Sequence, residues 1–330
     1  MTVFVKMHAN GNDFMIIDAW HTKTPIVSST KRIQQWSHRQ TGIGFDQLLW
    51  VSSPDNSRAE AQCRIFNADG SEAGQCGHGI ACMASWLYQK DYVQKTAFRI
   101  ATSAGIWSVQ LNQNGWVTVD LGQPIWEPDH IPLIAPRAHR LYPLACPDQA
   151  NALLKEAYAV LQRKQLDYLI ELKHLLPQQS IIWNRNLETI LHKPANLLCG
   201  ALALGNPHCV IPIRDIADFT AELGSLLSEH PNFPEQTNVA LMQMLTPSHI
   251  ILKVYERGVG FNRACGSGAC AAVIVGRLLG YLASEVTVEF ASAGDKVQVT
   301  WTACKTSVQL HTQIHLVFEG QVGLEDISFL

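Results

Sequence analysis

Apolar and polar residues alternate in short runs over most of the chain, which is the pattern of half-buried β-strands. Runs bounded by Gly, Asn, Asp or Pro predict a first series of strands at 3–7, 15–18, 48–51, 63–66, 98–102, 106–111 and 116–121. A second series is predicted at 198–203, 209–213, 239–244, 250–255, 286–290, 296–301, 308–310 and 315–318. Between the two series, residues 149–176 carry apolar residues at helical spacing, which predicts one or two amphipathic helices. We therefore expect a helical insertion at about 137–197.

The two series of strands share an internal repeat. The repeat is centred on Cys-Gly-x-Gly, which occurs at Cys76 and again at Cys265. In both copies an aromatic residue stands ten positions before the cysteine, a polar residue stands nine before it, and an apolar helix is predicted after it. The polar residues at this position are Asn67 and Glu256. The repeat predicts two similar domains, each with a loop, a Cys-Gly-x-Gly turn and a helix.

The repeat extends upstream of the two turns. Gly11-Asn12-Asp13-Phe14 is echoed by Gly205-Asn206-Pro207-His208. Gln47 and Asn238 also precede their respective cysteines by similar distances. These matches favour a pseudo-twofold protein with one site between its domains.

A cysteine at the start of a helix is suited to chemistry. The positive end of the helix dipole lowers the pKa of a thiol and so increases the fraction of thiolate. Glycines let the backbone approach a ligand closely, and the free N–H groups of the first turn can bind a carboxylate. Two such turns on opposite sides of one carbon would form a two-base racemase. One thiolate would remove the α-proton and the other thiol would return a proton to the opposite face, with no metal or other cofactor.

A zinc site is the alternative explanation of the same cysteines. Cys76 with Cys82 and Cys265 with Cys270 would supply the thiolates. Their spacings are longer than the usual zinc-knuckle spacing, and Cys82 and Cys270 fall inside apolar helices, where they are expected to be core residues. The sequence therefore favours catalysis and predicts no metal.

Length and charge narrow the class of protein. A chain of 330 residues suits two domains. The net charge of −3 gives no nucleic-acid footprint, and no apolar run is long enough to cross a bilayer. The nine cysteines are odd in number and scattered, which does not indicate a disulfide framework. With no secretory signal, we expect a cytoplasmic protein that binds neither membrane nor nucleic acid.

The chain resembles bacterial diaminopimelate epimerases. The resemblance runs from about residue 3 to about residue 318 and is interrupted by the insertion. The motifs that carry it are Lys6-Met7-His8, Gly11-Asn12-Asp13-Phe14, Gly42-Ile43-Gly44-Phe45-Asp46-Gln47, Phe66-Asn67-Ala68-Asp69-Gly70-Ser71-Glu72, Cys76-Gly77, Gly205-Asn206-Pro207-His208, Asn238, Tyr255-Glu256-Arg257-Gly258 and Ala264-Cys265-Gly266-Ser267-Gly268-Ala269-Cys270.

The resemblance implies an α/β (α+β) fold of two pseudo-symmetric domains, each a curved sheet wrapped around a central helix, with the active site in the cleft between them. The predicted domains are 1–122, completed by a C-terminal strand at about 316–330, and 123–315. The implied assembly is a homodimer, the substrate is diaminopimelate, and no cofactor is expected.

The resemblance also implies roles for single residues. Cys76 and Cys265 would be the acid–base pair, and the other members of the site would bind substrate or support the thiols. The reacting carboxylate would lie on the backbone N–H groups of Gly77, His78, Gly266 and Ser267, and the reacting end would be lined by Asn12, Gln47 and Glu256. The distal amino-acid group would contact Asn67, Asn206, Asn238 and Arg257, while His208 and Glu256 would help to set the protonation of the thiols.

Some positions depart from the family pattern. His78 replaces the usual Asn after Cys-Gly, and Ala81 replaces an Arg. Phe261 and Asn262 replace the usual Glu-Thr before the second catalytic turn. The stretch Thr312-Gln313-Ile314-His315 also departs from the family's C-terminal motif. A protonated His78 would lower the pKa of Cys76.

Two other functions stay open on sequence grounds. The departures allow a racemase of the same fold that acts on another amino acid, such as histidine or a proline derivative. A descendant that binds a ligand or zinc without catalysis is the other alternative.

Overall fold

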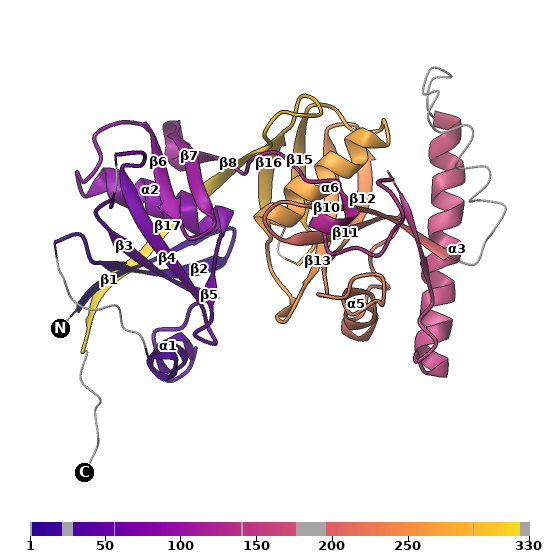
Figure 1. The fold of residues 1–330 in the computed structure, drawn as a ribbon, viewed down its shortest axis with the longest axis horizontal. Helices are drawn as coiled ribbons and strands as arrows, with labels where there is room; N and C mark the ends of the chain where they lie inside the picture. The colour runs from indigo at the N-terminus through magenta and orange to yellow at the C-terminus, as the bar shows by residue number, and fades with distance from the viewer. Residues whose placement is uncertain are drawn as a thin grey trace, which may run out of the picture. The chain divides into compact units, whose positions relative to one another are not determined.

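The structure is a computed structural model that describes residues 2–21, 29–55, 57–139, 141–175, 196–292 and 294–323. The chain forms two compact units (Figure 1). The first unit contains Met1–Leu121 together with Gln309–Leu330, and the second unit contains Gly122–Val308. Each unit has its own sheet and its own central helix.

The sheet of the first unit closes on itself as a barrel. Its strands are β1 (Thr2–Ala9), β2 (Asn12–Asp18), β3 (Gln47–Ser52), β4 (Ala61–Asn67), β6 (Ala97–Thr102), β7 (Gly105–Leu111), β8 (Trp116–Asp120) and β17 (Gln309–Val322). Neighbours pair in the order β1-β2-β3-β4-β6-β7-β8-β17, and β17 pairs with β1 to complete the ring. A short strand, β5 (Glu72–Ala73), forms a hairpin with β4. Closure leaves the barrel without an unpaired edge.

Helix α2 (Gly77–Gln89) fills the barrel of the first unit. It packs against β1, β2, β3, β7, β8 and β17. Its side chains from His78 to Leu87 are buried except at Ser85, so almost no face of the helix is exposed to water. A helix that is apolar on all sides is stable only when it is surrounded by protein. The helix is therefore the core of this unit.

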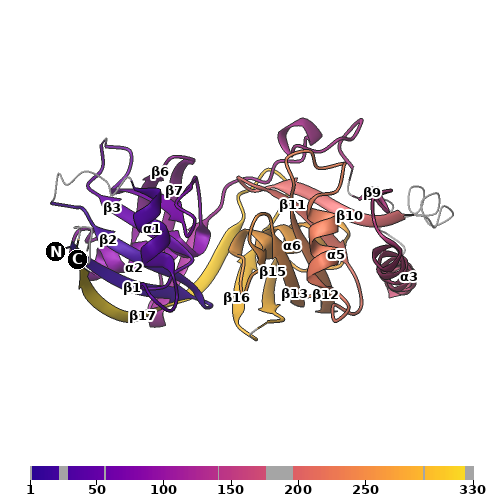
Figure 2. The same ribbon diagram turned by 90° about the horizontal axis from the view of Figure 1, so that it is seen from below.

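The second unit repeats this topology (Figure 2). Its strands are β9 (Tyr142–Ala145), β10 (Asn196–Ala203), β11 (Pro207–Pro212), β12 (Asn238–Thr246), β13 (His249–Glu256), β14 (Gly260–Phe261), β15 (Glu285–Phe290) and β16 (Lys296–Thr300). From β10 to β16 the pairings are antiparallel, parallel, antiparallel, parallel and antiparallel, as they are from β1 to β7. Helix α6 (Gly266–Leu278) packs on this sheet as α2 does in the barrel. The predicted repeat and fold class are confirmed.

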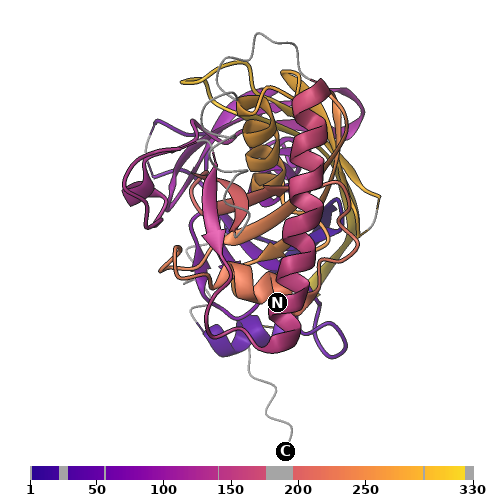
Figure 3. The same ribbon diagram turned by 90° about the vertical axis from the view of Figure 1, so that its right-hand side faces the viewer.

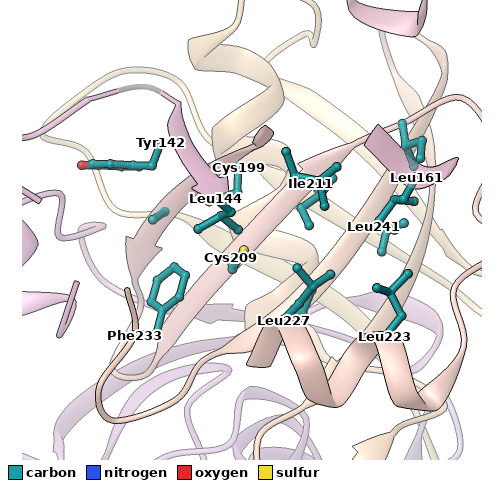
Figure 4. Close-up of a cluster of buried hydrophobic side chains, with 14 of the residues drawn as sticks. Tyr142, Leu144, Leu161, Cys199, Cys209, Ile211, Leu223, Leu227, Phe233 and Leu241 are labelled. Atoms are coloured by element: carbon teal, nitrogen blue, oxygen red, sulfur yellow. The ribbon is translucent and has the colours of Figure 1, made fainter. Parts of the chain in front are cut away.

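Both faces of the second sheet are buried at strands β10 and β11. Strand β10 has buried residues at every position from Leu197 to Ala203. Gly200 faces α6 so closely that a Cβ would lie 2.5 Å from Val275. On the other face, Cys199 and Cys209 lie in an apolar cluster with side chains of α5 (Ala221–Ser228) (Figure 4). A sheet covered on both faces explains why this strand lacks polar alternation.

The inserted segment contributes one strand and one long helix to the described residues. The predicted helix at 149–176 is present as α3 (Ala152–Leu175) (Figure 3). It packs against β10 and α5. The buried Gln165 side chain donates to the carbonyl of Leu198 at 2.7 Å and accepts from its N–H at 2.8 Å. Residue 140 and residues 176–195 also belong to the predicted insertion and lie outside the described residues.

The remaining differences from the sequence prediction are small. The predicted strands at 308–310 and 315–318 are one continuous strand, β17. Strand β9 was not predicted, and neither were the short helices α1 (Thr30–Ser37), α5, η1 (Gln113–Gly115) and η2 (Pro128–His130). None of the helices in the described part of the chain has the length and apolarity needed to span a membrane.

Candidate active site

Cys76 is the N-cap residue of α2. Its backbone is extended, with φ −159° and ψ 109°, and its sulfur accepts a hydrogen bond from the N–H of Gly79 at 3.5 Å. A Cβ at Gly79 would lie 3.2 Å from both Leu49 and Phe14, so the glycine lets the turn approach the barrel wall. The thiol is half-buried. A sulfur beside the first-turn N–H groups is the geometry that the sequence predicted.

The first unit carries three polar side chains of the predicted site in addition to Cys76. They are Asn12 on β2, Gln47 on β3 and Asn67 on β4. The Cys76 thiol donates to Asn12 Oδ1 at 3.8 Å. Gln47 and Asn67 are register partners across β3 and β4, and Gln47 Nε2 donates to Asn67 Oδ1 at 2.9 Å. Gln47 Oε1 is buried and has no hydrogen-bond partner among the described residues. An unsatisfied acceptor of this kind is suited to a cationic donor such as an ammonium group.

His78 differs from its predicted electrostatic role. Its side chain is buried, and burial lowers its pKa to about 4, so it is neutral at neutral pH. The hypothesis that it adds a positive charge beside Cys76 is therefore wrong. The reason is desolvation, which disfavours the imidazolium form in the barrel interior. Its neighbour Ala81 is also fully buried in α2.

Cys265 is the N-cap residue of α6 and is more deeply buried than Cys76. It is 8% exposed, and its sulfur lies 3.6 Å from Ser267 Oγ. Burial raises the pKa of this thiol well above its usual range, and the charge and hydrogen bond of Glu256 raise it further. The hydroxyl of Ser267 and the N–H of Gly268 lower it, but by less. The expectation of a lowered pKa at the helix start is therefore wrong for Cys265, because burial and Glu256 outweigh the helix N–H groups.

Arg257 lies in the turn between β13 and β14. Its backbone N–H donates to Asn238 Oδ1 at 2.9 Å, and its guanidinium donates to the carbonyl of Glu235 at 2.7 Å. The rest of the side chain is exposed. Asn238 thus fixes the backbone of the residue that offers a guanidinium fork.

The buried His208 of β11 pairs with Asn206, a partly exposed residue just before the strand. His208 Nε2 lies 2.9 Å from Asn206 Oδ1, and His208 is the register partner of Asn238. Burial lowers the pKa of His208 to about 3, with a further contribution from the charge of Arg257, so the ring is neutral. Because Nε2 faces an amide oxygen, it carries the proton and Nδ1 is an acceptor. No described residue donates to that Nδ1.

Phe261 and Asn262 have clear structural roles. The Phe261 ring packs edge-on against Phe219, two residues before α5, at 5.2 Å and against Tyr255 of β13 at 5.5 Å. Lys253 Nζ lies 4.8 Å from the centre of the same ring. Asn262 Oδ1 accepts from the N–H of the next residue, Arg263, at 2.7 Å. The aromatic substitution therefore anchors the β13–β14 hairpin to the segment that leads into α5.

Cys82 and Cys270 are fully buried inside α2 and α6. Within the described segments, no three His, Cys, Asp or Glu side chains gather in a way that could hold a metal ion.

Sequence reasoning missed a set of charged residues beside Asn12. Asp46 accepts from Asn12 Nδ2 at 2.9 Å and from Arg39 at 2.6 Å. Arg39 also forms a two-point pair with Asp13, which in turn pairs with the buried Lys6. Asp46 and Asp13 stand within two quoted motifs, Gly42–Gln47 and Gly11–Phe14, so their motif membership was the available signal.

Comparison with known proteins identifies the family and the fold of the chain. The family model described as diaminopimelate epimerase matches residues 4–127 and 200–313. A probable proline racemase from Agrobacterium radiobacter has TM-score 0.62 and 11% identity, covering 99% of this chain and 94% of that one. A hydroxyproline epimerase from Agrobacterium vitis has TM-score 0.64 and 12% identity, covering 99% and 93%. A predicted epimerase from Pseudomonas aeruginosa has TM-score 0.58 and 13% identity, covering 99% and 100%. At these identities the three structures share the fold.

Proposed function

The chain belongs to the diaminopimelate epimerase family, and from this premise we propose that it is a cofactor-independent diaminopimelate epimerase. It would interconvert the LL and meso forms in the pathway to lysine and peptidoglycan precursors. The observation that carries the proposal is the repeated helix start: each unit has a cysteine as the N-cap of its central helix. Epimerisation needs one acid–base group for each face of the α-carbon, and the repeat supplies two.

The proposed reaction requires the Cys76 and Cys265 turns to lie on opposite sides of the bound α-carbon. The thiolate on one side removes the α-proton, so that an S–H bond forms and the C–H bond breaks. The thiol on the other side gives its proton to the carbanion and becomes a thiolate. Atoms and charge balance, and the two thiols exchange roles with each turnover.

The raised pKa of Cys265 favours one distribution of protons over the two thiols before the reaction begins. Burial and Glu256 raise the pKa of Cys265, which supports Cys265 as the thiol that donates a proton in the resting enzyme. Cys76 would then be the base for the first half-reaction. His208 is neutral, and its bare Nδ1 can accept a hydrogen bond from a thiol. This supports a role for His208 in setting thiol protonation.

The substrate groups have matching partners. The reacting carboxylate would bind the first-turn N–H groups of both helices, where oriented donors stabilise the charge that develops on the carboxylate. These donors are Gly77, His78, Gly266 and Ser267.

The unsatisfied oxygen of Gln47, with Asn12 and Glu256 nearby in the proposed site, suits the reacting ammonium group. The Arg257 fork suits the second carboxylate, because a guanidinium binds a carboxylate through two parallel hydrogen bonds. Asn67, Asn206 and Asn238 would bind the remaining polar atoms at the distal end. As part of the same proposal, we expect a homodimer in the cytoplasm.

The test is incorporation of solvent deuterium. Reduced protein is incubated with LL-diaminopimelate in deuterated water, and the α-carbon is examined for label and for the meso product. Cys76→Ala and Cys265→Ala should each reduce epimerisation by several orders of magnitude, while Cys304→Ala, at an exposed thiol, should retain it. Labelling of histidine or a proline derivative, with none of diaminopimelate, would instead establish the racemase alternative.

A further inference from the structure

Four charged side chains form a network beside Asn12, the residue whose amide oxygen contacts Cys76. Lys6 lies on β1, Asp13 on β2, and Arg39 and Asp46 between α1 and β3. Arg39 donates to both Asp13 oxygens, at 2.9 and 3.0 Å, and to Asp46 Oδ1 at 2.6 Å. Lys6 Nζ donates to Asp13 at 2.7 Å. These contacts fix the position of the Asp46 carboxylate.

Asp46 is a hydrogen-bond acceptor in each of its side-chain contacts. Besides the Arg39 bond, its Oδ2 accepts from Asn12 Nδ2 at 2.9 Å and from the Asp13 N–H at 3.1 Å. An ionised carboxylate can only accept, so the Asn12 amide must present its nitrogen to Asp46. The amide oxygen of Asn12 then points the opposite way. The shape of an asparagine side chain allows either end of its amide to face Asp46, and the Asp46 carboxylate selects the orientation with the nitrogen toward itself.

The amide oxygen of Asn12 fixed in this way faces the Cys76 thiol. Asn12 Oδ1 is 3.8 Å from the Cys76 sulfur, and an oxygen acceptor can bind S–H but not a thiolate. Opposing it, the Gly79 N–H donates to the same sulfur. Cys63 and Cys82 are also close enough to influence Cys76, but burial raises the pKa of both, so they carry no charge at neutral pH.

We propose that Asp46 is a positioning residue that turns the Asn12 amide oxygen toward Cys76, so that Asn12 stabilises the protonated form of this thiol. The inference rests on the proposed function in one respect, because Asn12 would stabilise the S–H form that Cys76 takes once it has removed the α-proton. The assignment itself concerns only contacts within the first unit.

The test measures the thiol without a substrate. The rate of alkylation of Cys76 by iodoacetamide is followed against pH, with the Cys76 peptide quantified by mass spectrometry. In Asp46→Asn the new amide can accept or donate, so Asn12 can turn its N–H toward the sulfur and favour the thiolate. The alkylation midpoint should fall by about one pH unit, or about tenfold in thiolate fraction below the midpoint. Because burial and Asp13 raise the pKa of Asp46, rates are compared above neutral pH.

Further variants separate positioning from general destabilisation. Asn12→Ala removes the acceptor and should also lower the midpoint, and adding Asp46→Asn to it should cause no further change. Asp18→Asn is the matched control, because Asp18 is a carboxylate at the end of β2 with partners of its own, the Tyr92 hydroxyl at 2.7 Å and the Trp20 N–H at 3.0 Å. It should leave the midpoint unchanged.

An unchanged midpoint in folded Asp46→Asn, or an equal shift in Asp18→Asn, overturns the assignment. If Asp46→Asn does not fold, Asn12→Ala carries the test, and an unchanged midpoint there refutes the contact. Alkylation needs no substrate, so the two proposals can fail separately. A lowered midpoint in Asp46→Asn, combined with no deuterium exchange into diaminopimelate by the unaltered protein, would reject the proposed function and keep the role of Asp46.

Discussion

Glu256 is expected to control the protonation of Cys265. The carboxylate lies within hydrogen-bonding reach of the buried thiol, and its charge raises the pKa of that thiol. Glu256→Gln removes the negative charge and keeps nearly the same shape. A thiolate at position 265 is then no longer opposed by a neighbouring anion, so the pKa of Cys265 should fall.

The expected fall in the pKa of Cys265 follows from its interaction with the Glu256 charge. Two unit charges about 4 Å apart interact by about 4 kcal/mol at an effective dielectric constant of about 20. This energy corresponds to about 3 pH units and is an upper bound, because solvent weakens the interaction and glutamine can still hydrogen-bond the sulfur. We expect a fall of about one to two pH units. Burial of Cys265 is unchanged, so its contribution to the pKa persists in the variant.

The assay is alkylation of the Cys265 peptide against pH by a small reagent, with Glu285→Gln as a control at an exposed carboxylate of the same unit. In deuterium exchange at neutral pH, Glu256→Gln should slow the half-reaction that begins with Cys265 as the proton donor. A midpoint that stays unchanged or rises would refute the reasoning, because it would mean that the Glu256 charge does not act on Cys265.

Three further predictions address specificity, stability and the meeting of the two turns. Arg257→Lys should raise KM for diaminopimelate by about tenfold, since lysine lacks the two-point fork; steady-state kinetics with an unchanged KM would contradict this. Gln165→Leu should lower the free energy of unfolding by about 2 kcal/mol or more, because it leaves the N–H and carbonyl of Leu198 unpaired, and urea unfolding measures it. Oxidation should crosslink Cys76 to Cys265 and inactivate the enzyme reversibly, with substrate giving protection; peptide mapping that finds no such crosslink in the inactive protein would count against a shared site.

Local patterns were sufficient to predict the repeated architecture. Cys-Gly-x-Gly followed by an apolar run defines a helix start from neighbouring residues alone, and both turns have that form. Strand β17 was divided in the prediction because Thr312 interrupts the apolar alternation between Leu310 and Ile314. In the structure Thr312 is fully buried, and its hydroxyl donates to Asn10 Oδ1 at 2.7 Å. A tertiary partner therefore made a polar residue compatible with the core.

The electrostatics of the site could not be predicted from neighbouring residues. The neutral state of His78 and the raised pKa of Cys265 both depend on burial by distant strands. Asp46 follows the same logic, since its contact with Asn12 exists only because β2 and β3 pair in parallel. The prediction named candidate residues for the site, whereas the folded contacts determine their charge and orientation.

The most informative difference lies at one position of the repeat. Nine residues before the cysteine, the first copy has the amide of Asn67 and the second has the carboxylate of Glu256. A two-base reaction needs one thiol and one thiolate, and identical surroundings would give both sulfurs the same affinity for a proton. In the proposed reaction, the carboxylate in the second copy biases the single remaining proton toward Cys265. Asn67→Asp would place a carboxylate at this position in both copies, and in the proposed reaction it would remove the asymmetry that favours a thiol at Cys265 and a thiolate at Cys76 before the first proton transfer.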